Sequence, residues 1–109
     1  MAEAVLPASS LVPALVRMVN GAGGFATVIA RGSEWGGALL LLHRFGRDIV
    51  AYEKMPSLDG TPLWRTAASG EEKVAEFAAR QQRFDPDLWV LELDIADPAR
   101  FVPGLPASD

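Results

Sequence analysis

Apolar residues recur with a helical period in two parts of the chain. From about residue 9 to residue 20 they fall every three to four positions, and Leu11, Leu15 and Met18 form one stripe. A similar amphipathic pattern occupies residues 70–84, before an Asp-Pro-Asp sequence that is typical of a turn. The pattern therefore predicts two main helices, one near the start of the chain and one in its second half.

Between and after these helices, apolar and polar residues alternate with the period of two that is typical of β-strands. Glycine, proline and aspartate residues separate the alternating segments, so the connections are predicted to be short turns or loops. The fourth segment begins after a proline and is the least regular, which favours a position at the sheet edge. The predicted strands are residues 25–31, 38–44, 49–54, 63–67 and 88–95.

These elements predict a single α+β domain in the order α-β-β-β-(β)-α-β. Short connections favour antiparallel pairing, so three to four strands are expected to form a meander that is completed by a final strand. Both helices are expected to cover the same face of the sheet. The predicted domain spans residues 9–102, between a flexible N-terminal arm at 1–8 and a flexible C-terminal tail at 103–109.

Composition excludes several classes of function. The chain has 109 residues, no cysteine and a net charge of −4, which residues 1–70 and 71–109 share unequally as +1 and −5. Without cysteine there are no disulfides, thiolate nucleophiles or cysteine-based metal sites. An acidic chain without a basic run is a poor candidate for nucleic-acid or membrane binding. We therefore expect a cytoplasmic protein that has no cofactor, metal, nucleic acid or membrane partner.

Three sequence strings resemble a known family. They are RFDPDLWVLE at residues 83–92, GFATVIARG at 24–32 and GALLLL at 37–42. Together they are similar to an alphaproteobacterial family of small proteins known as domain of unknown function 1491. The resemblance covers about residues 10–95 and implies a free-standing, cytoplasmic bacterial protein. It implies no particular activity.

Few residues offer catalytic chemistry. The glycines at 21, 23 and 24 follow a predicted helix and precede a strand, which is the reverse of the order in nucleotide-binding loops. His43 is the only histidine, and it shares a strand face with leucines, so it is either a general base or a hydrogen-bonded core residue. Asp85 and Asp87 suit the turn around Pro86 better than a cation site. The pattern favours a non-catalytic protein.

Arginine and tryptophan residues supply the candidate binding groups. Arg17, Arg31 and Arg44 lie in the less acidic part of the chain, where guanidinium groups could bind carboxylates or phosphates. Trp35 lies in a predicted turn and Trp64 on a predicted edge strand, and both positions are hard to bury.

These residues support two hypotheses. The first is a non-catalytic protein-interaction module, plausibly a homodimer, that uses Trp35 and Trp64 and binds itself or another protein. The alternative is a protein that binds a small anionic ligand, or a small enzyme, with the arginines and His43 as its site.

Overall fold

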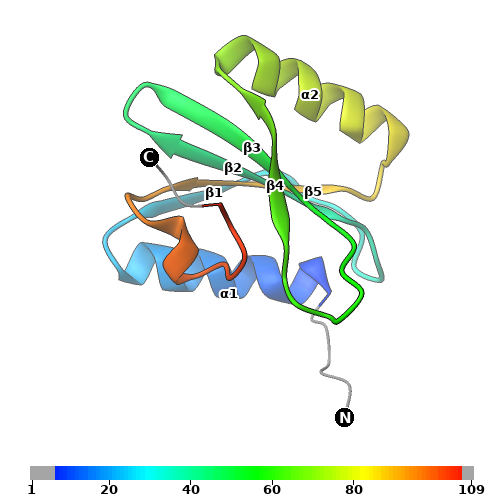
Figure 1. The fold of residues 1–109 in the computed structure, drawn as a ribbon, viewed down its shortest axis with the longest axis horizontal. Coiled ribbons are helices and arrows are strands. Elements are labelled where there is room, and N and C mark those ends of the chain that lie inside the picture. Colours follow the sequence, from blue (N-terminus) through cyan, green and yellow to red (C-terminus); the bar gives the residue numbers. More distant parts are fainter. Residues whose placement is uncertain (1–6, 107–109) are drawn as a thin grey trace.

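The computed structural model describes residues 7–106, and Figure 1 shows how its elements are arranged. Most of the predicted arm, at residues 1–8, and the end of the predicted tail, at 103–109, lie outside the described residues. The domain limits therefore stay predictions. The elements are α1 (Ala8–Gly21), β1 (Phe25–Ala30), β2 (Leu39–Phe45), β3 (Asp48–Lys54), β4 (Trp64–Ser69), α2 (Glu71–Phe84), β5 (Trp89–Asp94) and a short 3-10 turn, η1 (Pro98–Arg100).

The five strands form one mixed sheet in the order β1-β5-β2-β3-β4. Strands β2, β3 and β4 form the predicted antiparallel meander, and β4 confirms that the segment at 63–67 is an edge strand. The first strand, however, does not pair with β2. The last strand lies between them, parallel to β2 and antiparallel to β1. The α+β class is confirmed, but the sheet is not a simple meander.

The two helices cover opposite faces of the sheet, so the prediction that both share one face is wrong. Figure 1 shows α2 and α1 on either side of the strands. Helix α1 contacts β1 and β5, whereas α2 contacts β3 and β4. The central strands are apolar on both faces, as a strand between two helical layers must be, and β2 reads as a continuous leucine run for that reason.

Each face of the sheet has its own apolar core. On the α1 side the core is built on Leu15, Leu41 and Leu91, and on the α2 side on Val74 and Val90. The buried stripe of α1 is Ala8, Val12, Leu15 and Val19. The predicted stripe contained Met18 instead, and this residue is about half exposed because the helix turns Val12 and Val19 toward the sheet.

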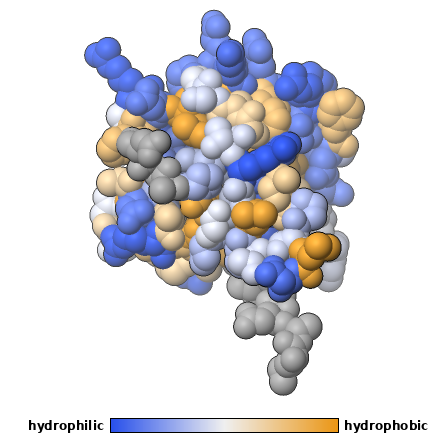
Figure 2. All heavy atoms as spheres, in the orientation of Figure 1, coloured by the Kyte–Doolittle hydropathy of each residue, from blue (hydrophilic) through white to orange (hydrophobic). Residues whose placement is uncertain are grey.

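The face of the molecule in Figure 2 carries small groups of apolar residues scattered among polar ones. Single exposed apolar residues are ordinary on protein surfaces and indicate no site by themselves. A functional site must therefore be sought where an exposed apolar residue lies beside a cavity or a charged group.

Candidate functional site

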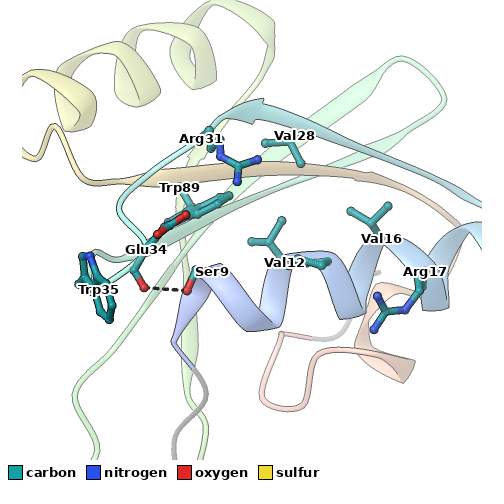
Figure 3. A pocket seen from close by; sticks show the side chains of 10 residues that line it. Ser9, Val12, Val16, Arg17, Val28, Arg31, Glu34, Trp35 and Trp89 are labelled. Carbon is teal, nitrogen blue, oxygen red and sulfur yellow. Dashed lines mark hydrogen bonds between the residues drawn. The ribbon is translucent and has the colours of Figure 1, made fainter.

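A hollow of about 670 Å³ opens between the first two elements of the chain, α1 and β1 (Figure 3). This volume lies within the usual range for ligand sites, roughly 300–1,000 Å³. Valine side chains contribute its apolar lining, two arginines and a glutamate contribute its charges, and two tryptophans lie at one end. The lining residues are Ser9, Val12, Pro13, Val16, Arg17, Val28, Arg31, Glu34, Trp35 and Trp89.

A β-bulge in β1 brings Arg31 to this hollow. The pairing of β1 with β5 shifts between Val28 and Ala30, so one extra residue of β1 is inserted there. Up to the bulge, Ala26 and Val28 face α1, but Ala30 packs into the core on the α2 side. Strict alternation would place Arg31 on the face opposite Val28. The extra residue places both side chains in the same hollow.

Trp35 lies at the tip of the β1–β2 loop, and the base of this loop is held by the turn before β5. The amide of Ser33 donates to the carbonyl of Asp87 at 3.1 Å. The amide of Trp89 donates to the carbonyl of Ala38 at 2.9 Å, and its indole N–H donates to the carbonyl of Ser33 at 2.8 Å. Three hydrogen bonds therefore connect the loop to Asp87 and to Trp89 at the start of β5.

Two glycines allow the loop to lie close to Asp87, and a serine of α1 forms a further hydrogen bond to the loop. A Cβ at Gly32 or Gly37 would overlap the carbonyl oxygen of Asp87, and Gly37 also has a φ of +96°. On the other side, the hydroxyl of Ser9 donates to the carbonyl of Glu34 at 2.9 Å (Figure 3). The Trp35 side chain is 92% exposed on a loop whose backbone is held from two sides.

The charges of the hollow have the opposite sign to the charge of the chain. Arg17 and Arg31 outnumber Glu34, which gives a net charge of +1 in a chain of −4. Within residues 7–106, neither arginine lies within ion-pair distance of a carboxylate. The Arg31 guanidinium lies 5.6 Å from the centre of the Trp89 ring, which orients it beside the hollow (Figure 3). This arrangement suits a carboxylate or another anionic group.

The structure brings together three of the six residues that the sequence indicated, namely Trp35, Arg17 and Arg31. Trp64 lies elsewhere, and only 6% of its surface is exposed in the core on the α1 side. Its edge strand is covered there, because the carbonyl of Gly104 accepts from the amide of Trp64. The C-terminal segment thus shields a residue whose strand position suggested exposure.

His43 and Arg44 also lie away from the hollow. His43 is buried, and its Nε2 lies 2.8 Å from the carbonyl oxygen of Ile95, so this nitrogen carries the proton and donates it. Arg44 lies on the α2 face and donates to Glu71 at 3.0 Å and to Glu92 at 3.3 Å. These carboxylates raise the pKa of Arg44 and join α2 to β2 and β5. The small-ligand hypothesis required the side chains of His43 and Arg44 to be free to bind a ligand. Both side chains are instead bonded to other residues of the fold.

Apart from Arg17, sequence reasoning did not identify the residues of α1 that line the hollow. Ser9, Pro13 and Arg17 are spaced by four residues, so they form a stripe along α1 beside Val12 and Val16. That spacing is visible in the sequence. It carries no functional meaning until β1 is known to lie beside this face of the helix.

Within residues 7–106, no helix has the length and apolar character that are needed to cross a membrane.

Comparisons with known proteins place the chain in a family. The model of the family described as "Protein of unknown function (DUF1491)" matches residues 6–103. A solution structure from A. tumefaciens is 29% identical, with a TM-score of 0.77, and covers 94% of this chain and 98% of its own. A crystal structure of a DUF1491 family protein from Caulobacter crescentus is 28% identical, with a TM-score of 0.79, and covers 92% and 97%.

An NMR structure of a DUF1491 family protein from the same organism is 28% identical, with a TM-score of 0.80 over 97% of this chain and all of its own. No curated protein matches the chain. The family model spans most of the residues, and the structural matches run nearly the full length of both chains. The chain therefore belongs to the DUF1491 family, as its three sequence strings predicted.

Proposed function

We propose that this protein is a non-catalytic interaction module that binds a partner protein at the hollow between α1 and β1, with Trp35 as its main contact. The observation that carries this proposal is the combination of a 92% exposed tryptophan with a loop backbone held by hydrogen bonds. Tryptophan is among the residues that contribute most to protein interfaces. A loop that is already ordered loses little conformational entropy when it binds.

The apolar lining beside Trp35 supports the same proposal. Val16 and Val28 form an apolar surface beside the tryptophan, and Arg17 lies at the far end (Figure 3). An interface of this kind has an apolar centre and a charged rim. The residues with catalytic chemistry, above all His43, lie elsewhere in the core.

The test compares two surface variants in cross-linked pull-downs from the native cell. Trp35→Ala removes the proposed contact, whereas Leu58→Ala removes an equally exposed apolar side chain on a loop away from the hollow. We expect a stoichiometric partner that is retained by the wild type and by Leu58→Ala and is lost with Trp35→Ala. A set of captured proteins that does not change with Trp35→Ala would refute the proposal.

The second candidate is a small anionic ligand in the same hollow, and the observation that favours it is the pair of arginines without a carboxylate partner among the described residues. A thermal-shift screen of carboxylate and phosphate metabolites would test this candidate. A shift that is lost with Arg31→Gln, together with pull-downs that do not depend on Trp35, would favour the ligand over the partner protein.

A further inference from the structure

Resting on the function proposed above, we infer that the partner is bound as an extended segment that pairs with the open edge of β1 and places a carboxylate side chain against Arg31. The hollow lies directly beneath this edge, between β1 and α1. Side chains of an added strand would alternate between the hollow and the opposite face of the sheet. The proposal thus joins the edge and the hollow into one binding site for a peptide.

The two edges of the sheet differ in how they are protected. At β4, the amide of Trp64 bonds to Gly104, and Arg65 places a charge in the strand. Natural proteins commonly protect edge strands by covering them or by placing charges there. The segment from Phe25 to Ala30 contains neither a charge nor a proline, and Phe25 and Ile29 are exposed. Beyond Ala26, whose amide is bonded to Asn20, β1 is therefore the less protected of the two edges and can accept another strand.

One side-chain contact identifies which amides of β1 face outward. The amide of Ala26 donates to Oδ1 of Asn20 at 3.0 Å, so it points away from β5. Amides of alternate residues in a strand point to the same side. The amide of Val28, which precedes the bulge, therefore points outward too. Within residues 7–106, we find no hydrogen-bond partner on that outer side of Val28.

The charges favour another protein over a second copy of this chain. The segment from Phe25 to Arg31 contains no acidic residue, so a β1–β1 dimer would supply no carboxylate to Arg31 from the paired strand. The hollow has a net charge of +1, and within residues 7–106 its two arginines form no ion pair with a carboxylate. A partner segment with apolar residues at alternate positions and one acidic residue satisfies both features.

The first experiment selects a displayed library of ten-residue peptides on the full-length protein and measures the affinity of an enriched synthetic peptide by fluorescence anisotropy. We expect an acidic residue at a fixed position. Single backbone N-methyl groups along the peptide should weaken binding at least tenfold at every second residue and have little effect between. This period of two is specific to strand pairing. Absence of an enriched peptide, or N-methyl effects without the period, would overturn the inference.

Protein variants test the same geometry. Val28→Pro removes the outward N–H, and Val28→Ala keeps it while shortening the side chain. Because both changes shorten the side chain, the comparison isolates the N–H, and we expect Val28→Pro to bind the peptide at least tenfold more weakly than Val28→Ala. Arg31→Gln should weaken the acidic peptide tenfold and should not weaken its glutamine analogue. Amide exchange by NMR provides a readout in the unaltered protein, since bound peptide should slow exchange at Val28.

The outcomes separate this inference from the proposed function. If Trp35→Ala abolishes binding but the N-methyl effects show no period of two, the interaction module stands and the added strand is refuted. If Trp35→Ala has no effect on any peptide or partner, the proposed function itself fails. A dimer that light scattering detects in the wild type but not in Val28→Pro would show that a second copy occupies the edge, which would also overturn the inference.

Discussion

Replacing Gly37 with alanine should loosen the loop that carries Trp35. A residue with a side chain at a positive φ costs about 1 to 2 kcal/mol, and φ at Gly37 is +96°. The new Cβ would also overlap the carbonyl of Asp87, so the loop must move away from the turn. That movement breaks the bond from Ser33 to Asp87 and strains the bond from Trp89 to Ala38, each worth about 0.5 to 1.5 kcal/mol.

If both bonds are lost, these terms sum to about 2 to 5 kcal/mol of lost stability, and the restriction of the unfolded chain by alanine offsets roughly 0.4 to 1 kcal/mol of it. The neighbouring Gly36 offers a matched control. It has no positive φ, and a Cβ there would meet nothing within 4 Å. We expect Gly36→Ala to change stability by less than about 0.5 kcal/mol.

Urea unfolding, followed by tryptophan fluorescence and circular dichroism, measures both variants, with equal m-values as the check that the same surface is exposed. Exchange rates of the loop amides should rise in Gly37→Ala while those of β3 stay unchanged. If Gly37→Ala and Gly36→Ala were equally stable, the loop would not be held by its contact with Asp87, and the argument for an ordered Trp35 loop would be refuted.

Three further predictions address other parts of the molecule. Trp64→Ala should cost about 3 to 5 kcal/mol because its side chain is buried, whereas Trp35→Ala should stay within about 0.5 kcal/mol, and equal losses in urea unfolding would contradict this assignment. Arg44→Gln should cost about 1 kcal/mol because Glu92 is then left partly buried without a cation, and adding Glu92→Gln should restore part of that loss in the same assay. Hydrogen bonds from Thr61 and Ser57 lower the pKa of Asp59 from 3.8 to about 2. The contribution of Asp59 to folding stability should therefore be complete above pH 3.8 and be lost as the pH falls through about 2. An NMR titration of the Asp59 carboxyl carbon with a midpoint near 3.8 would refute this prediction.

The helices and strands follow from local patterns, and for that reason the sequence predicted nearly all of them. Their arrangement depends on which strands pair, and pairing depends on contacts between distant residues. Short connections indicated that β1 should pair with β2. Strand β5 is apolar on both faces, however, and gains most when it is buried between β1 and β2. A strand that is apolar on both faces needs a covering layer on each face of the sheet. For this reason α1 and α2 cover opposite faces.

Only part of the candidate site could be predicted from the sequence, for similar reasons. Trp35 was recognised because a turn of glycine and polar residues offers no place to bury an indole. Trp64 was misplaced because its side chain is buried in a core that includes Val102, a residue about forty positions away, and its amide is bonded to the carbonyl of Gly104. Strict alternation would place Arg31 on the wrong face, since nothing in the apolar run of β1 marks the inserted residue of the bulge.

The central place of β5 also determines when the molecule can be completed during synthesis. Strand β1 leaves the ribosome early but must wait for β5, about sixty residues later, before it has a neighbour in the sheet. Until then, the apolar face of α1 and the edge of β1 that pairs with β5 lack their final partners, and chaperones recognise such exposed surfaces. Because Trp89 of β5 lines the hollow, the hollow is complete only after this strand has been made. A chain that stops before β5 would therefore lack the complete hollow, and under the function proposed above it should not compete with the finished protein for a partner.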